Sequence, residues 1–136
     1  MNNLEQTLSI IKPDAVERNL VEEIKNEFKT NGFTIKNEKK IKLEKSEAEK
    51  FYQVHQSKPF YNALCTYLSS GPIVVMILEK SNAVLDNRKL MGATDPTKAE
   101  EGTLRKKYGI SIDKNSVHGS DSIENAKIEI NFFFKD

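Results

Sequence analysis

The stretch from Ile73 to Leu78 constrains the fold most, because each of its residues is apolar and most of them are branched. A run of this kind, just after Gly71 and Pro72, predicts a strand in the middle of a sheet whose two faces are both covered. It is the longest apolar run in the chain, yet it is far shorter than the roughly 20 residues of a membrane-spanning helix. The run therefore favours a soluble protein that is built around a buried sheet and has no membrane partner.

Three further segments predict strands that join this one. Thr7–Ile11 is short and apolar, and Lys12-Pro13 stops it, so the strand places Lys12 at its C-terminal end. Phe33–Leu43 alternates for part of its length, but polar residues interrupt the alternation, which indicates a bulge or an edge strand. Val117-His118 predicts a last, short strand.

Apolar residues at helical spacing predict helices between these strands. They are a helix from Leu20 that ends at Asn31-Gly32, one opened by a capping box of Ser46 and Glu49, one from Ser57-Lys58-Pro59 to Leu68, one from Asn82 to Met91, and a last one capped by Asp121 and Glu124. Residues 92–113 stay polar and aperiodic, and loops of that length are usually functional or disordered.

The order of these elements predicts an α+β fold. It matches a ferredoxin-like βαββαβ sandwich, in which helices cover an antiparallel sheet of four strands, with added helices and the long loop over about residues 92–113. The chain has 136 residues and a mass of 15.5 kDa, which fits a single domain over residues 1–136.

Composition limits the classes of partner. Lys and Arg number 21 against 20 Asp and Glu, so the net charge of +1 argues against bulk attraction to nucleic acid or to an anionic membrane. One cysteine, Cys65, cannot form an internal disulfide, and two histidines are too few for a zinc site. The opening residues MNNLEQ also lack the basic segment of a secretory signal. We therefore expect a cytoplasmic protein whose anion sites are local.

The segment NSVHGSDS at residues 115–122 is the most informative for chemistry. It places His118 three residues before the start of the predicted last helix, where free backbone N–H groups and the helix dipole stabilise an anion. An unperturbed imidazole is mostly neutral at pH 7, so its lone pair can attack as a nucleophile. A histidine in this position is also compatible with an ordinary surface residue. No P-loop and no G-x-G-x-x-G motif is present, so a nucleotide site must be built differently.

Five segments together resemble the nucleoside diphosphate kinase family. They are TLSIIKPDAVERNLV near the start, YQVHQSKPFYNAL, SGPIVVMILE, NRKLMGATDP, and SIDKNSVHGSDSIENAKIEINFFF at the end, and they cover nearly the whole chain. The resemblance implies a phosphotransferase that moves the γ-phosphoryl group of a nucleoside triphosphate, typically ATP, to a nucleoside or deoxynucleoside diphosphate. It implies a ping-pong cycle through a phosphohistidine on His118, with low base selectivity.

The resemblance also implies a role for each matched residue. Lys12, Arg88, Thr94 and Arg105 match the residues that hold the phosphates; Asn115 matches the ribose contact; Phe60 and Ile112 match the residues around the base; Tyr52, His55 and Leu64 match the pocket wall; Ser120 and Glu129 match the pair that orients the imidazole, which reacts through Nδ1. The implied cofactor is Mg²⁺ carried by the nucleotide, with Asp121 nearby and no direct protein ligand.

Other interpretations of single residues stay open from the sequence. Phe60, Tyr52 and Leu64 also fit helix residues of the core, while Arg88 and Arg105 also fit solvated cations. For the whole chain, Tyr108 beside basic residues allows a nucleic-acid-binding module, although the RNA-recognition motif pattern is missing. A non-catalytic scaffold is the second alternative.

The resemblance implies assembly from dimers into a homo-oligomer, for which we expect a hexamer, with a tetramer as the alternative. Three positions depart from the family's pattern: Asn19 stands where Gly is common, Glu101 where Pro is common, and Lys107 within a segment that is usually small, acidic and aromatic. A customary ion pair therefore cannot form through residue 107.

Overall fold

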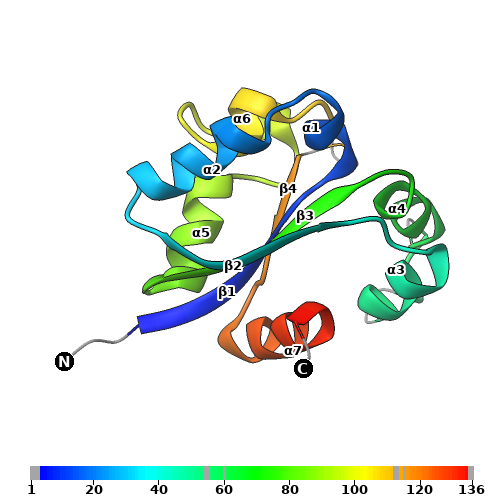
Figure 1. Ribbon diagram of the computed structural model, residues 1–136. Coiled ribbons are helices and arrows are strands. Elements are labelled where there is room, and N and C mark those ends of the chain that lie inside the picture. Colours follow the sequence, from blue (N-terminus) through cyan, green and yellow to red (C-terminus); the bar gives the residue numbers. More distant parts are fainter. Residues whose placement is uncertain (1–3, 54–55, 60, 112–113, 115, 135–136) are drawn as a thin grey trace.

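The structure is a computed structural model that describes residues 4–53, 56–59, 61–111, 114 and 116–134. Its elements follow the predicted order (Figure 1). They are β1 (Leu4–Ile11), α1 (Pro13–Glu17), α2 (Val21–Thr30), β2 (Thr34–Ile41), α3 (Lys45–Phe51), α4 (Tyr61–Leu68), β3 (Ile73–Ser81), α5 (Ala83–Met91), the 3-10 helix η2 (Pro96–Lys98), α6 (Leu104–Tyr108), β4 (Val117–Gly119) and α7 (Ile123–Phe134).

The described strands form one four-stranded sheet in the order β2-β3-β1-β4. All three pairings are antiparallel, and β1 lies between β3 and β4. This order confirms the α+β, ferredoxin-like sandwich. Because Ile10 of β1 faces His118 of β4 in the register, the short strand holds His118 against the centre of the sheet.

The two faces of the sheet carry separate cores, as the fully apolar run predicts. In β3, Met76 and Leu78 pack with residues of α1, α2, α5 and α6, whereas Ile73 and Val75 pack with residues of α3, α4 and α7. Figure 1 shows these two groups of helices on opposite sides of the sheet. Cys65 lies buried in the second core, and burial raises the pKa of its thiol, which agrees with a packing role.

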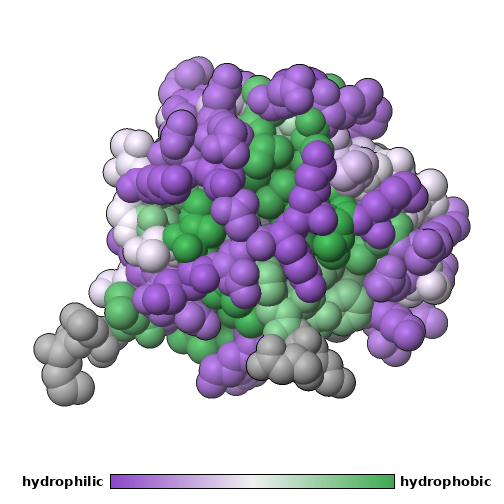
Figure 2. All heavy atoms as spheres, viewed as in Figure 1, coloured by the Kyte–Doolittle hydropathy of each residue, from purple (hydrophilic) through white to green (hydrophobic). Residues whose placement is uncertain are grey.

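β2 is the exposed edge strand that its interrupted alternation predicts. Six of its eight residues are exposed, and its pairing with β3 shifts register between Ile35 and Asn37, so both an edge and an irregularity are present. Figure 2 shows the same face as Figure 1, with many hydrophilic side chains over it and hydrophobic ones visible between them.

Two predicted helix caps are wrong by one or two residues. The capping box of α3 joins Glu44 and Glu47, with Glu44 N donating to Glu47 Oε1 at 2.9 Å, and not Ser46 and Glu49. The backbone explains the shift, because Glu44 is still extended and the helix already begins at Lys45. At α7 the hydroxyl of Ser122, and not the carboxylate of Asp121, accepts from Asn125 N at 3.1 Å. Asp121 instead accepts from the side-chain amide of Asn125.

The long segment after α5 is more ordered than its polar sequence predicts. Asp95 caps η2 by accepting from Thr97 N at 3.0 Å, and Thr103 caps α6 by accepting from Lys106 N at 3.3 Å. Lys107, one of the departures, forms an ion pair with Glu27 of α2 at 2.7 Å. Asn19 takes a φ of 61°, a conformation that asparagine adopts more readily than most residues. None of the described helices is long and apolar enough to cross a bilayer.

Candidate functional site

His118 lies in the middle of β4 with one ring nitrogen engaged. Its Nε2 is 3.1 Å from Oε1 of Glu129 on α7, and the same oxygen accepts from Ser120 Oγ at 2.7 Å. Ser120 Oγ in turn accepts from Leu8 N at 3.2 Å, which ties the pair to β1. A carboxylate beside Nε2 favours the tautomer with the proton on that nitrogen, and this leaves a lone pair on Nδ1. The ring is 20% exposed and so is open to a ligand.

Two aromatic rings contact this imidazole on the side of α3. The ring of Phe51 is 5.4 Å from that of His118 and nearly perpendicular to it, and the ring of Tyr52 follows at 6.4 Å. Burial raises the pKa of Tyr52 above its ordinary value, and the charge of Glu129 raises it further, so the phenol stays protonated. The prediction of Tyr52 near His118 is therefore supported by position. The sequence reasoning did not find Phe51, because its helix stripe gives only a core signal.

Gly119 lets β4 lie close against α5, on the face of the strand opposite His118. A Cβ atom at this position would overlap Asn87 Nδ2 and would lie 2.7 Å from Met91 Cε. Asn87 and Met91 are both buried, so neither can move aside easily. The glycine therefore fixes the separation between His118 and the helix that carries Arg88.

Arg105 is a buried cation beside this strand. Its guanidinium donates to Gly92 O at 3.0 Å and to Val117 O at 2.9 Å, so it spans the segment between α5 and β4. Burial, together with the charge of Arg88, lowers the pKa of Arg105 to about 10, so the group is still charged at neutral pH. Within the described part of the chain, none of the ion pairs gives Arg105 a carboxylate partner. A buried cation without a carboxylate is suited to an anionic ligand.

The other predicted phosphate ligands have different surroundings. Lys12 directly follows β1, as predicted, and is nearly buried, with its backbone N–H donating to Ser116 O at 2.8 Å. Arg88 and Thr94 are exposed on α5 and in the segment after it. Leu64 is half-buried on α4 and packs against the second core.

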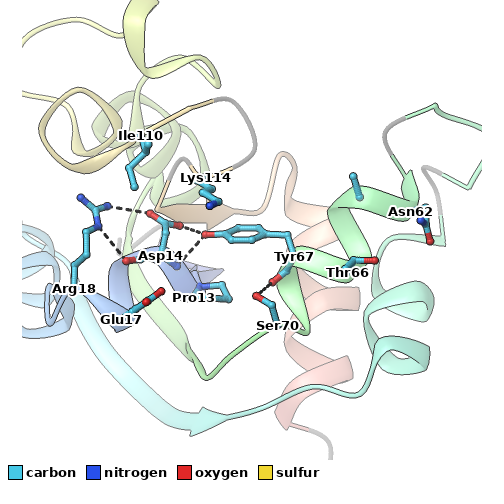
Figure 3. Close-up of a pocket in the computed structure, with 11 residues that line it drawn as sticks. Pro13, Asp14, Glu17, Arg18, Asn62, Thr66, Tyr67, Ser70, Ile110 and Lys114 are labelled. Carbon is cyan, nitrogen blue, oxygen red and sulfur yellow. Dashed lines mark hydrogen bonds and ion pairs between the residues drawn. The ribbon is translucent and has the colours of Figure 1, made fainter.

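Four of the predicted residues, His55, Phe60, Ile112 and Asn115, lie outside the described residues. A cavity of about 730 Å³ lies between α1, α4 and the segment after α6 (Figure 3). The lining includes Pro13, Ala63, Tyr67, Ile110 and Lys114. Two of its lining residues, Pro13 and Ala63, are next in the sequence to Lys12 and Leu64.

The donor set suits a metal ion that arrives with a nucleotide. Across the described residues, no three His, Cys, Asp or Glu side chains gather to hold a metal. Mg²⁺ commonly uses one or two carboxylates together with substrate phosphates. Asp121 is exposed and lines a cavity of about 240 Å³ together with Arg88, so one carboxylate and one guanidinium group share an opening.

Comparisons with known proteins agree with this geometry. A sequence model described as nucleoside diphosphate kinase matches residues 5–136. Nucleoside diphosphate kinases of Nitratiruptor sp. and Wolinella succinogenes are 57% and 56% identical over 131 residues, which is 96% of this chain and of each relative. The nucleoside diphosphate kinase of Aquifex aeolicus superposes with a TM-score of 0.95 at 38% identity, covering 97% of this chain and 96% of that one. The enzyme of Halobacterium salinarum, solved in complex with CDP, gives 0.93 at 36% identity and covers 97% and 88%.

Proposed function

Because the chain belongs to the nucleoside diphosphate kinase family, we propose that it transfers the γ-phosphoryl group of a nucleoside triphosphate, typically ATP, to a nucleoside or deoxynucleoside diphosphate. The single observation that carries the mechanism is the contact of His118 Nε2 with Glu129, which leaves Nδ1 free to attack. Substrates react in turn at one site, in a ping-pong cycle.

His118 is the nucleophile of this cycle. Its Nδ1 attacks the γ-phosphorus, the bond from phosphorus to the β–γ bridging oxygen breaks, and the nucleoside diphosphate leaves with the electron pair of that bond. Glu129 and Ser120 orient the ring, and the carboxylate stabilises the charge that the imidazole gains. In the second half a terminal oxygen of a nucleoside diphosphate attacks the phosphorus, the bond from phosphorus to Nδ1 breaks, and its electron pair returns to the neutral ring.

Fixed cations hold the phosphates during both halves. Lys12, Arg88 and Arg105 are the cations, and the hydroxyl of Thr94 adds a neutral donor. The surroundings of Arg105 give this role its strongest support. The guanidinium is buried and has no carboxylate beside it among the described residues, so the phosphates of the substrate would balance its charge. Asp121 would hold Mg²⁺ through its water shell, and the ion would neutralise oxygen charge on the nucleotide.

The base and ribose lie at the outer end of the site. Phe60 and Ile112 sandwich the base, Asn115 binds the ribose, and His55, Tyr52 and Leu64 complete the wall. Stacking accepts every base because each has a π-face, so base selectivity is low. The CDP in the Halobacterium salinarum relative supports a nucleotide site in this fold.

Three further properties belong to the same proposal. The protein acts in the cytoplasm on nucleotides, with no dedicated nucleic-acid partner. It assembles as a homo-oligomer, a hexamer in preference to a tetramer, within one domain over residues 1–136. Mass measurement under native conditions distinguishes the two assemblies.

Labelling with γ-³²P-ATP and Mg²⁺ tests the proposal. We expect acid-labile, alkali-stable phosphate on the protein, which a nucleoside diphosphate then removes. The chain has two histidines, so His118→Asn should abolish the label while His55→Asn keeps a label that maps to His118. Label that persists in folded His118→Asn contradicts the mechanism.

A further inference from the structure

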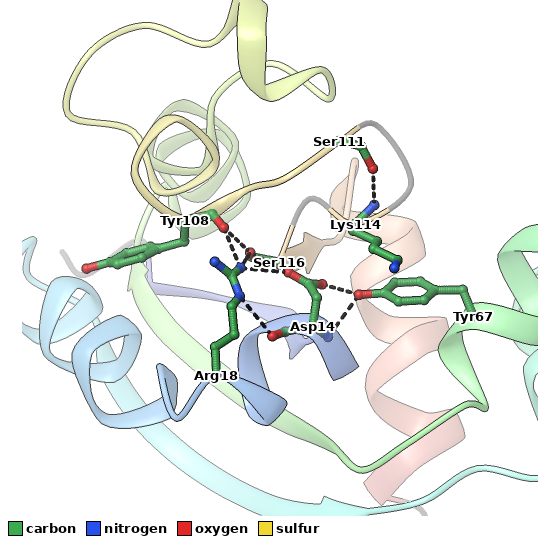
Figure 4. Close-up of polar contacts among 7 residues, drawn as sticks. All are labelled: Asp14, Arg18, Tyr67, Tyr108, Ser111, Lys114 and Ser116. Carbon is green, nitrogen blue, oxygen red and sulfur yellow. Dashed lines mark hydrogen bonds and ion pairs between the residues drawn. The ribbon is translucent and has the colours of Figure 1, made fainter.

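Asp14, on α1, has the most densely bonded carboxylate near the site. Its side chain is 4% exposed, and three side chains of the described residues donate to it. Ser116 Oγ lies 2.8 Å and Arg18 Nη2 3.0 Å from Oδ2, and the hydroxyl of Tyr67 donates to Oδ1 (Figure 4). Tyr67 also accepts from Asp14 N at 2.9 Å, so α1 and α4 are joined twice.

The same cluster holds a strained residue. Ser116 is buried and has a φ of 75°, in the left-handed region that side chains other than glycine rarely adopt. Such a conformation persists only where the surroundings determine it. Here the Ser116 hydroxyl contacts Asp14 and accepts from Arg18 at 3.2 Å, and its carbonyl accepts from Lys12 N. Arg18 also donates to the carbonyl of Tyr108 at the end of α6.

Every segment in this cluster carries a residue of the proposed nucleotide site close by in the sequence. Lys12 precedes Asp14 by two positions, Leu64 precedes Tyr67 by three, Arg105 precedes Tyr108 by three, and His118 follows Ser116 by two. The Asp14 carboxylate therefore ties together α1, α4 and the entry to β4, and Arg18 extends the cluster to the end of α6. Figure 3 shows Asp14 and Tyr67 meeting at the cavity between α1 and α4.

We propose that Asp14, acting through Tyr67 and Ser116, is a positioning residue that sets the spacing between the base-binding wall on α4 and the strand that carries His118. The inference rests on the proposed function, because it assumes that a nucleotide spans these two parts. Asp14 touches no reacting atom. Its effect is on how well the γ-phosphorus meets Nδ1 when the base and ribose are held at the other end.

The chemistry of the cluster makes it a rigid support. Burial raises the pKa of Tyr67 above its ordinary range, and the hydrogen bond to Asp14 raises it further, so the phenol remains a donor at any physiological pH. The carboxylate is buried and its hydrogen bonds are charge-assisted. Each hydrogen bond that is lost leaves a polar group without a partner.

Two phosphoryl donors separate positioning from simple stability. ATP has to span both parts of the site, whereas phosphoramidate carries a phosphoryl group with no base or ribose and reports the reactivity of His118 alone. Tyr67→Phe removes the hydroxyl with little change of shape. Tyr61→Phe is the matched control. The hydroxyl of Tyr61 also joins α4 to another helix, because it donates to Glu49 O at 2.9 Å, but it is not part of the Asp14 cluster.

We expect Tyr67→Phe to slow labelling by ATP about tenfold and to leave labelling by phosphoramidate within about twofold of the wild type. Tyr61→Phe should keep the wild-type ratio of the two rates, whatever it does to thermal stability. Equal slowing with both donors, no slowing with ATP, or the same altered ratio in Tyr61→Phe would overturn the inference.

A double-mutant cycle gives the second test. If Asp14 acts through Tyr67, adding Tyr67→Phe to the Asp14→Asn variant should slow ATP labelling by less than about twofold more. Additive losses contradict the inference. Failure of the proposed function is distinguishable, because it would leave the wild type unlabelled by either donor.

Discussion

Two carboxylates beside this site, Glu129 and Asp14, differ in their partners and in their exposure. Glu129 accepts from Ser120 and contacts His118, and its side chain is 18% exposed. Asp14 has three side-chain donors in the described chain and is 4% exposed. Glu129 faces a ring whose charge changes in each half of the proposed cycle, and it contacts that ring directly. Asp14 joins parts that must not move, and there burial and many bonds are the advantage.

The comparison predicts that loss of the two charges separates activity from stability. Glu129→Gln should slow phosphohistidine formation by about 10²- to 10⁴-fold, since the ring loses the anion that fixes its tautomer and balances its charge. Its free energy of unfolding should fall by less than about 1 kcal/mol. Rapid-quench labelling and urea unfolding measure the two effects. Glu124→Gln, exposed in the first turn of the same helix, is the control for the charge of α7. Equal rates in the two variants would break the comparison.

For Asp14→Asn we expect the larger effect on stability. Replacing this buried carboxylate by an amide removes the charge that Arg18 pairs with and turns one acceptor into a donor facing the same side chains, which should cost about 1–3 kcal/mol. Asp86→Asn is the matched control, since its ion pair with Lys80 is partly exposed and should cost less than about 1 kcal/mol. Chemical denaturation of both variants measures the difference. Similar losses would mean that the Asp14 cluster adds no more than a surface pair.

The strained backbone at Ser116 predicts a smaller difference in stability between two variants, and the sign of that difference is fixed. Ser116→Ala and Ser116→Gly both remove the hydroxyl, but only glycine accepts a φ of 75° without steric cost. We expect Ser116→Gly to be the more stable by about 1 kcal/mol, after allowing for the larger entropy of glycine in the unfolded chain. Thermal unfolding of the pair measures this directly. A more stable alanine variant would show that the conformation carries no strain.

The smallest effect is a pH dependence that belongs to Tyr67. Because its folded-state pKa is raised by burial and by Asp14, the folded protein keeps this proton to higher pH than the unfolded chain does. The stability it contributes is complete below pH 10 and is lost as the pH rises toward the folded-state pKa. The advantage of wild type over Tyr67→Phe should therefore shrink by at most about 1 kcal/mol between pH 8 and pH 10.5, because the hydroxyl is only half-buried. Urea unfolding at both values checks the sign; a growing advantage would contradict it.

Much of the fold could be predicted because its signals are local. The apolar run at 73–78 and the stops at Gly32 and Gly92 act over a few residues, and the corresponding strand and helices occur where expected. The caps were harder, since Glu44/Glu47 and Ser46/Glu49 have the same spacing and only the path of the backbone selects between them. The placement of His118 beside Glu129 followed from the family resemblance and not from spacing.

The Asp14 cluster could not be predicted in the same way. Tyr67 and Ser116 lie 53 and 102 residues from Asp14, so their meeting depends on the whole topology. The only local signal is the spacing of four between Asp14 and Arg18, which is common on solvated helices. Nothing in the residues around Ser116 indicates a positive φ, because that conformation results from contacts made by distant segments.

The close approach at Gly119 has a consequence for how this sequence can diverge. Position 119 shares its space with the side chains at 87 and 91, so the three positions form one steric unit across two elements. We expect related sequences with a larger residue at 119 to carry compensating smaller residues at 87 or 91. Covariation among these three columns in an alignment would reveal that constraint without any kinetic measurement.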